Sequence, residues 1–411
     1  MKKHLSQIIL TFILLGCSQN NSYDPIAQIQ RDIAILASDS LMGREVGTEG
    51  EEMAANYISG QFEKAGLSAK GTDNFLQSFF VKDSDNPHEQ AKVGVAKDSA
   101  GITGYNVLGF IDNASEEVVV IGAHYDHLGM GTFSSLHRGK QEVHNGADDN
   151  ASGVAAMMHL ARVLSKKKLN RGILFIGMSG EEKGLWGSNY FTKNPTIDLS
   201  KVNYMINMDM VGRFDQSRGL AVNGTGTSPI WNWMLDNSNT DSLKLIKGES
   251  GVGPSDHTSF YLQDIPVLHF FSGQHEDYHK PGDDAEKINE EGILKIASLI
   301  ERIVIDLDDE EKIEFTKTKD ESRDSPRFTV TLGVVPDYLY DGSGMRIDGV
   351  SEDKPAQKAG IKKGDIVIQL GDSAVTDMMS YMRALSSFKK GDQTSVTIER
   401  EGKKIDYEIE F

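Results

Sequence analysis

The sequence predicts an α/β protein with a mixed, largely parallel central sheet flanked by helices, followed by a smaller, mostly β domain. Several apolar runs are nearly continuous, as in strands that are covered on both faces, and helical patterns lie between them. After a highly charged stretch, short alternating segments replace the long apolar runs. The expected strands of the first domain cover residues 106–111, 117–123, 172–178, 204–210 and 266–271.

Helical patterns flank and separate these strands. Apolar residues recur at helical spacing in 25–36, and 49–65 repeats that pattern until Gly66 ends it. Together with the strands, these patterns predict one α/β domain over residues 25–306. The other helical patterns cover residues 153–166, 186–191, 229–237 and 286–307.

The composition is that of a globular protein with an acidic surface. The chain has 411 residues, of which 38% are hydrophobic, and its formal net charge is −18. This length suggests two or three domains of roughly 100–200 residues each. The acidic balance argues against broad nucleic-acid binding, which needs Lys and Arg against phosphates, and is compatible with cation binding.

The first 17 residues are predicted to be a targeting signal. Basic residues precede an apolar run over 5–15, which is too short for a membrane span of about 20 residues. The run Leu14-Leu15-Gly16-Cys17 resembles the bacterial lipobox, in which Cys17 would become the first mature residue and carry a lipid. Residues 18–24 are polar and are interpreted as a tether. The expected location is the bacterial cell envelope, with membrane anchoring through Cys17; the alternative is an ordinary signal peptide.

Side chains able to bind a metal follow three of the predicted strands. His124 and Asp126 follow one strand, Glu181 and Glu182 follow another, and Asp209 lies near the end of a third. Because the carboxyl ends of the strands form the ligand-binding crevice of an open α/β sheet, we expect these side chains to converge.

Two further segments carry ligand types. Asp149 lies in the run Gly-Ala-Asp-Asp-Asn-Ala-Ser-Gly at 146–153, and His279 follows Tyr278 in a segment closed by Pro281. Carboxylates crowded in a dry cleft repel one another, and a cation relieves that repulsion. With no cysteine available, a site of imidazole nitrogen and carboxylate oxygen suits zinc and does not exclude Mn or Co.

In order and motif, the five segments resemble the co-catalytic dizinc exopeptidases of metallopeptidase family 28, over most of the mature chain. The resemblance implies the zinc exopeptidase fold and two Zn²⁺ per chain. His124 and Asp209 would bind one zinc, Glu182 and His279 would bind the other, and Asp149 would bridge both.

The resemblance also implies catalytic roles. Glu181 would be the general base, taking a proton from a metal-activated water and delivering it to the leaving amine. Asp126 would orient His124, and Tyr278 would donate a hydrogen bond to the oxyanion. The peptide bond between Asp149 and Asn150 is expected to be cis, as it often is in this family.

The predicted function is therefore dizinc-dependent exopeptidase activity, with peptides as substrates and removal of N-terminal residues as the expected reaction. Carboxypeptidase or glutaminyl-cyclase chemistry on the same scaffold remains an alternative. A catalytically dead scaffold that only binds peptides is a second alternative, which the complete ligand set disfavours.

Other histidines are expected to lie outside the ligand set. Residues 275–279 match the His-Glu-x-x-His pattern of single-zinc proteases, but that motif needs a helix and breakers flank this run. His275 is therefore predicted to be a loop residue. His137 and His144 are expected to border the site without binding metal. The run 255–257 is read either as a helix start or as part of the substrate cleft.

Residues 307–326 are highly charged and predict a linker, and residues 327–411 predict the second domain. Leu332-Gly333-Val334-Val335 and the run Ala-x-x-Ala-Gly-Ile-x-x-Gly-Asp-Ile-Val at 356–367 resemble a PDZ domain of the bacterial protease type. The resemblance implies that an extended peptide or a protein C-terminus binds by strand addition, with 332–335 as the carboxylate loop. The alternative is a structural or regulatory lid without a ligand.

Overall fold

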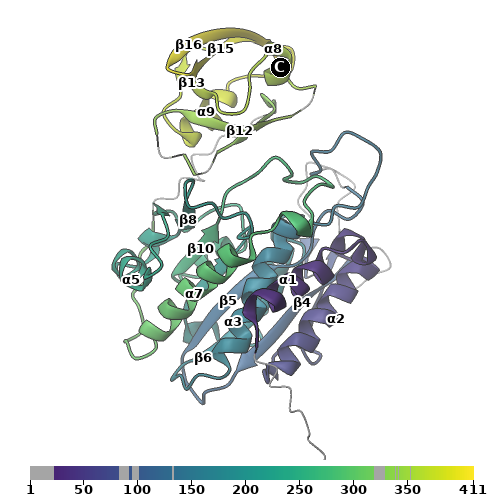
Figure 1. Cartoon of the computed structure of the whole chain (residues 1–411), viewed down its shortest axis with the longest axis vertical. Helices are drawn as coiled ribbons and strands as arrows, with labels where there is room; N and C mark the ends of the chain where they lie inside the picture. Colours follow the sequence, from purple (N-terminus) through teal and green to yellow (C-terminus); the bar gives the residue numbers. More distant parts are fainter. Residues whose placement is uncertain are drawn as a thin grey trace, which may run out of the picture.

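The computed structural model of the chain contains two sheets, each with its own hydrophobic core (Figure 1). Cys17 and the predicted signal segment lie outside the described residues. Within the described part of the chain, no helix combines the length and apolar character needed to cross a membrane. The structure describes residues 23–82, 92–94, 101–131, 134–318, 329–337, 339–340, 342–351 and 353–411.

The larger sheet has ten strands in the order β3-β2-β4-β6-β5-β7-β10-β8-β9, with β1 beside β4. Strands β6, β5, β7 and β10 run parallel to their neighbours in this series, whereas β4 is antiparallel to β6 and β8 is antiparallel to β10. The predicted mixed, largely parallel sheet is therefore confirmed. Its strands are β1 (Ser68–Ala69), β2 (Leu76–Lys82), β3 (Lys92–Val93), β4 (Ile102–Ile111), β5 (Val118–His124), β6 (Gly172–Met178), β7 (Val202–Met208), β8 (Leu220–Asn223), β9 (Leu245–Gly248) and β10 (Val267–Phe271).

Helices cover both faces of this sheet. Alternate residues of β5 point to opposite sides: Val119 and Ile121 pack with α1, α2, α3 and α7, whereas Val118 and Val120 pack with α4 and α6. This two-sided burial explains why the strands are apolar throughout. The helices are α1 (Pro25–Leu36), α2 (Glu49–Lys64), α3 (Gly153–Leu164), α4 (Trp186–Lys193), α5 (Trp231–Ser238), α6 (His257–Tyr261) and α7 (Glu290–Asp306).

The charged segment after α7 is described as far as Thr318, and this part packs on the larger domain. Ile313 is buried, and its backbone N–H donates to the side chain of Asn203 at 3.1 Å. Thr316 donates its backbone N–H to the carbonyl of Thr227 at 2.8 Å. Residues 307–318 are therefore attached to the domain, although their sequence is that of a charged linker.

The smaller sheet is antiparallel, with the order β11-β12-β13-β15-β16 and β14 beside β13. Its core contains Leu332, Ile347, Val367, Val396 and Ile398. Among the described residues, β11 pairs on one side only, with β12. The elements are β11 (Val334–Pro336), β12 (Met345–Val350), α8 (Pro355–Ala359), β13 (Ile366–Leu370), β14 (Ser373–Ala374), α9 (Met378–Leu385), β15 (Gln393–Arg400) and β16 (Lys403–Glu410).

Candidate metal centre

The carboxyl ends of three adjacent parallel strands carry the predicted site residues. His124 is the last residue of β5, Asp209 directly follows β7, and Glu181 and Glu182 follow β6 after a Ser-Gly turn. Because β5 lies between β6 and β7, these side chains reach the same edge of the sheet.

Asp149 lies between two histidine–carboxylate pairs. Its Oδ1 is 3.3 Å from Nε2 of His124, which lies 3.2 Å from Oδ1 of Asp209. Its Oδ2 is 3.3 Å from Nε2 of His279, which lies 3.2 Å from Oε2 of Glu182. Each oxygen of Asp149 therefore belongs to a different group of potential ligands, as a bridging carboxylate requires.

The segment that carries Asp149 is held by its neighbour. The peptide bond between Asp149 and Asn150 is cis, as predicted. The Asn150 side chain donates to the carbonyl of Met208 at 3.0 Å and accepts from the backbone N–H groups of Met210 and Gly153, both at 3.1 Å. Asn150 thus ties the Asp149 segment to the end of β7.

Arg44 also holds the segments around Tyr125 and Gly146. Its guanidinium is buried and donates to the carbonyls of Tyr125, Gly146, Asn145 and Leu36. Burial lowers the pKa of Arg44 to about 10, and nearby carboxylates oppose that shift. Arg44 therefore remains cationic and connects the segments on which the predicted ligands lie.

Asp126 contacts the predicted base, Glu181, more closely than the predicted ligand His124. Its Oδ1 accepts the backbone N–H of Glu181 at 3.1 Å, whereas it lies 3.7 Å from Nδ1 of His124. The nearer partner of that nitrogen is the carbonyl of Asp126, at 3.2 Å. Residue 126 thus contacts His124 through backbone and side chain, and also holds the start of the Glu181 segment.

The pKa values of Glu181 and Glu182 are shifted in opposite directions. Burial raises the pKa of Glu181 well above its usual value, the charges of Asp209 and Asp256 add to the shift, and His124 opposes it. Burial would also raise the pKa of Glu182, but His279 and His127 lower it to about 2. One carboxyl of the consecutive pair therefore favours its protonated form and the other its ionised form.

The donor set fits two divalent cations. Among the described residues, two groups have potential ligand atoms within 4.8 Å of one another: His124, Asp149 and Asp209, and His127, Asp149 and Glu182. Burial disfavours charge on Asp149, yet its contacts with His124 and His279 lower its pKa well below the usual value. Ionised carboxylates with imidazole nitrogens are the ligands that zinc accepts.

His127 is a site residue that the sequence analysis did not single out. Its Nδ1 lies 2.8 Å from Oε1 of Glu182 and 3.9 Å from Oδ2 of Asp149. Its ring meets that of His279 edge-on, with centroids 5.9 Å apart. The available signal was its position three residues after His124, directly beyond a strand end.

The sequence analysis did not name Asp283, and it named Asp256 only as part of the run 255–257. Asp283 is buried and accepts backbone hydrogen bonds from Asp148 and Asp149. Asp256 directly precedes α6, and burial raises its pKa to about 7. The sequence around Asp283 gave no signal beyond its closeness to His279.

The remaining histidines lie apart from the two groups of potential ligands. His275 lies outside any helix, as predicted, and its Nε2 is 3.2 Å from Oδ2 of Asp148. His144 lies 2.8 Å from the Ser135 hydroxyl and meets the ring of His137 edge-on. His257 begins α6 and stacks on His269, with centroids 4.3 Å apart.

A cavity of about 190 Å³ opens onto the cluster. The Tyr278 ring stacks on that of His279, with centroids 3.8 Å apart, and forms part of the wall. The lining combines four carboxylates with apolar and amide groups, namely Asp149, Glu181, Glu182, Asp209, Met210, Asn223, Pro254, His269, Phe271, Gln274, Tyr278 and His279.

A mixed sheet between helices, with histidines and carboxylates at the ends of its parallel strands, is the fold of the zinc exopeptidases. A zinc aminopeptidase from Bacillus subtilis has this fold: its structure aligns with a TM-score of 0.52 and 20% identity, covering 70% of this chain and 98% of that one. A Bacteroides thetaiotaomicron glutaminyl cyclase also has it, with a TM-score of 0.55 and 16% identity over 68% of this chain and 97% of that one.

The chain contains a peptidase family M28 domain followed by a C-terminal PDZ domain. Residues 106–304 match the family model, and residues 304–411 match that of the PDZ domain. A curated relative, aminopeptidase YwaD of Bacillus subtilis (strain 168), is 31% identical over 213 residues, which cover 48% of this chain and 42% of that protein. The match therefore spans less than half the length of that relative.

Proposed function

We propose that the chain is an aminopeptidase that holds two zinc ions and releases N-terminal residues from peptides. The observation that carries the proposal is the placement of Asp149, whose two oxygens face two different histidine–carboxylate pairs. The name of the Bacillus subtilis relative, an aminopeptidase, supports the choice among exopeptidase activities.

In this proposal the five predicted ligands hold the metal ions: His124 and Asp209 one, Glu182 and His279 the other, with Asp149 between them. When bound, two zinc ions supply Lewis acidity, which polarises a peptide carbonyl and lowers the pKa of bound water. The remaining chemistry belongs to the protein side chains around the cluster.

Glu181 is proposed to transfer the proton. It is buried next to the cluster and lines the cavity, and burial raises its pKa. Such a carboxyl can take a proton and return it to a leaving amine, because its protonated form is not strongly disfavoured. Asp126 fixes its backbone through the 3.1 Å hydrogen bond. Tyr278, on the cavity wall, is proposed to donate a hydrogen bond to the developing oxyanion.

The decisive experiment compares wild type and Glu181→Gln, with and without chelator, on free, N-blocked and C-blocked peptides. We expect about two zinc ions per chain in both proteins, hydrolysis of peptides with a free N-terminus by wild type only, and loss of that activity with chelator. Glu52→Gln, on the exposed face of α2, is the matched control and should behave as wild type. Hydrolysis that survives N-blocking would replace this proposal with a carboxypeptidase, and ammonia release from N-terminal Gln would replace it with a cyclase.

We further propose that the PDZ domain binds an extended peptide or protein C-terminus. Strand β11 follows Leu332 and Gly333 and pairs only with β12 among the described residues, which is compatible with strand addition at its other edge. Peptides ending in a free carboxylate, tested against their amides by calorimetry, check this. Equal binding of the acids and the amides, or no binding of either, would favour the alternative that the domain is a structural lid.

Membrane anchoring through Cys17 is also a proposal. The basic start, the short apolar run and the only cysteine at its end support it. We expect lipid labelling of the wild-type chain in bacteria and none of Cys17→Ser. Labelling that persists in Cys17→Ser would contradict the anchor.

A further inference from the structure

A second, larger cavity lies between the peptidase domain and the PDZ domain. Its volume is about 620 Å³, within the range of about 300–1,000 Å³ typical of ligand-binding pockets. The peptidase side contributes residues of the loop 134–139 and of the turn 275–280, and the PDZ side contributes β12 and residues near α8. Figure 1 shows β12 on the side of the PDZ domain that is nearest the peptidase domain.

This cavity adjoins the metal centre. Tyr278 lines both cavities, and its ring stacks on the predicted ligand His279. The loop wall is tied to the same ligand, because Leu136 donates its backbone N–H to the carbonyl of His279 at 3.0 Å and Nδ1 of His279 lies 3.0 Å from the carbonyl of Ser134. Tyr278 therefore stands between the cavity at the metal centre and the cavity beside the PDZ domain.

Specific contacts hold the PDZ domain beside this turn. Arg218 donates to the carbonyl of Gln274 at 3.1 Å and to the carboxylate of Asp348 at 2.8 Å. Leu339 packs over Gly273, where an added Cβ would lie 2.6 Å from the leucine Cδ1. Both contacts attach the PDZ domain to residues 273–274, which directly precede the turn that carries His279.

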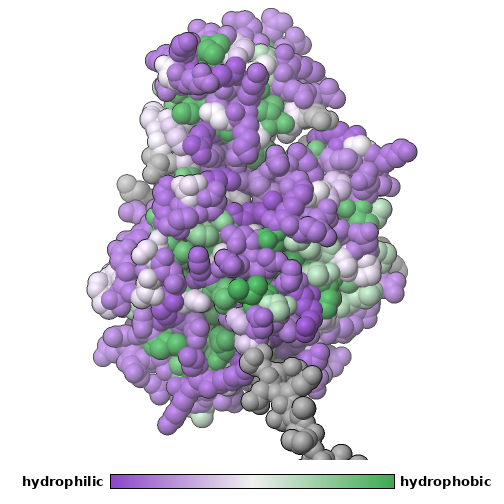
Figure 2. Space-filling view, in the orientation of Figure 1, coloured by the Kyte–Doolittle hydropathy of each residue, from purple (hydrophilic) through white to green (hydrophobic). Residues whose placement is uncertain are grey.

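The two cavities differ in charge. Four carboxylates line the small cavity at the metal centre, whereas Arg138, Lys280 and Lys363 line the interdomain cavity. Its acidic residues are Glu276 and Asp348, and Asp348 is already paired with Arg218 and with Lys363 at 3.1 Å. Arg138 makes no ion pair with any residue that the structure describes. Figure 2 shows hydrophilic side chains along the boundary between the domains.

The cations of the interdomain cavity suit the free C-terminus of a peptide. When the first residue of an unblocked peptide lies at the metal centre, its anionic carboxyl end would lie among these cations. The cavity at the centre, at about 190 Å³, is much smaller than the interdomain cavity, so the longer part of the substrate would occupy the latter.

We propose that the interdomain cavity binds the part of the substrate beyond the cleaved bond, including its C-terminal carboxylate, so that the enzyme acts on short peptides with a free C-terminus. This inference rests on the proposed aminopeptidase function. Arg138 and Lys363, which approach the cavity from different domains, are the carboxylate-binding residues.

The activity test uses the full chain and a series of peptides with the same first residue. The series contains an amino-acid anilide, tri- to hexapeptide acids, their amides and a peptide of about 20 residues. We expect kcat/KM for the short acids to exceed that for the matching amides by about tenfold, through KM, as for loss of one charge-assisted hydrogen bond. The 20-residue peptide should be the poorest peptide acid in the series.

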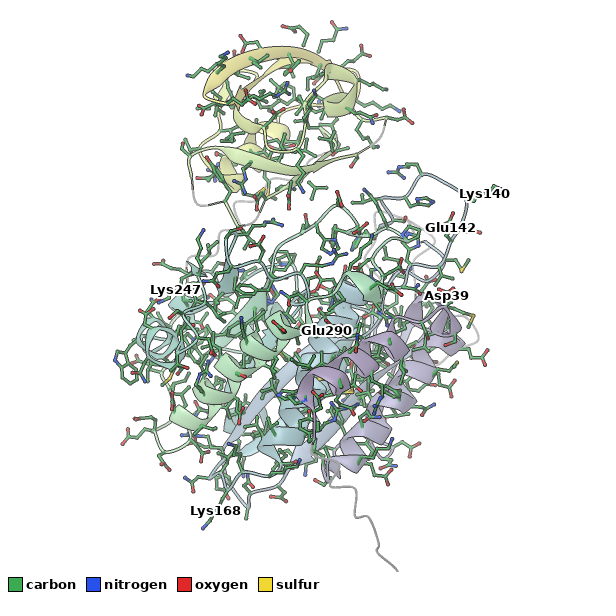
Figure 3. All side chains as sticks on the ribbon, viewed as in Figure 1. Asp39, Lys140, Glu142, Lys168, Lys247 and Glu290 are labelled. Carbon is green, nitrogen blue, oxygen red and sulfur yellow. The ribbon has the colours of Figure 1, made fainter. Side chains whose placement is uncertain are left out.

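Variants locate the effect. Arg138→Glu and Lys363→Glu should each bring the acid-to-amide ratio of kcat/KM close to one. Lys140→Glu and Lys362→Glu are the matched controls, because these exposed cations do not line the cavity. Figure 3 labels Lys140 on the projecting loop that continues from this wall. An unchanged ratio in both cavity variants would overturn the proposal.

A binding measurement avoids dependence on turnover. In the Glu181→Gln chain loaded with zinc, a tripeptide acid should bind about tenfold more tightly than its amide by calorimetry, and Lys363→Glu in that background should abolish the difference. Anilide hydrolysis with equal turnover of acids and amides at all lengths would refute this inference while leaving the aminopeptidase proposal intact. No hydrolysis of any member by the zinc-loaded wild type would instead refute the aminopeptidase proposal.

Discussion

The carboxylate of Asp283 holds the backbone of Asp149. One oxygen, Oδ2, accepts the backbone N–H of Asp149 at 3.0 Å and that of Asp148 at 2.9 Å. The other oxygen lies 3.7 Å from Arg213 and 3.9 Å from Nε2 of His275. Because all atoms of this contact are buried, Asp283 controls where the proposed bridging carboxylate sits.

Asp283→Ala should therefore weaken both stability and zinc binding. Two buried N–H groups would lose a charged acceptor, which is expected to lower the free energy of unfolding by about 2–3 kcal/mol. Denaturant unfolding and a zinc competition titration measure the two effects. Asp283→Asn retains an acceptor oxygen and should recover most of the stability. Wild-type zinc affinity in Asp283→Ala would contradict the positioning role.

His127→Ala should lower the affinity of the Glu182 and His279 group for zinc. His127 contacts Glu182 at 2.8 Å, and loss of such a partner typically lowers metal affinity by about 10–100-fold. Competition with a chromogenic chelator should show one weakened site and one unchanged site. His137→Ala is the matched control, because His137 contacts His144 and lies outside both groups of potential ligands. Equal weakening at both sites would indicate a general loss of structure.

Arg218→Ala should loosen the PDZ domain without unfolding the peptidase domain. Its guanidinium lies 2.8 Å from Asp348 and 3.5 Å from Asp337 of the PDZ domain. Small-angle scattering should report a larger radius of gyration, with the thermal midpoint of the peptidase domain unchanged. Arg302→Ala is the control, because Arg302 pairs with Asp241 inside the peptidase domain. An unchanged scattering curve would show that other contacts suffice.

His159 should make stability depend on pH below neutrality. Burial and the charge of Arg162 lower the pKa of His159 to about 4, from an unfolded value of about 6.5. The folded state therefore binds fewer protons than the unfolded state between these values, so stability present above pH 6.5 is lost as the pH falls towards 4.

The loss attributable to this one group is about 3 kcal/mol across that interval. His159→Gln should remove this part of the pH dependence, whatever its effect on stability at pH 8. Denaturant unfolding at half-unit steps from pH 8 to 4 measures the difference between the two slopes. Parallel curves would contradict the assignment, and an NMR titration of His159 would then show a pKa near its usual value.

The elements that could be predicted from the sequence are those whose structure depends on a local pattern of residues. The apolar runs of β5, β6 and β7 are buried on both faces, so their composition alone predicted parallel strands. Strand direction then predicted that the residues at their ends would converge, and His124 and Glu182 each lie in a group of potential ligands that includes Asp149.

The residues that hold the ligand-bearing segments in place could not be predicted in that way. Asp283 and Arg44 act on backbone groups more than 80 residues away along the chain, so no local pattern reveals their partners. The charged segment 307–318 likewise packs on the domain through contacts such as that of Ile313 with Asn203, which its composition did not predict.

The sequence by itself determined the strand ends and the types of ligand, because alternation, burial and charge are local properties of the chain. Only the tertiary structure decided that His127 contacts Glu182 and that the PDZ domain closes a cavity beside Tyr278. These are relations between segments distant in sequence, and the packing of the sheet, the loops and the second domain sets them.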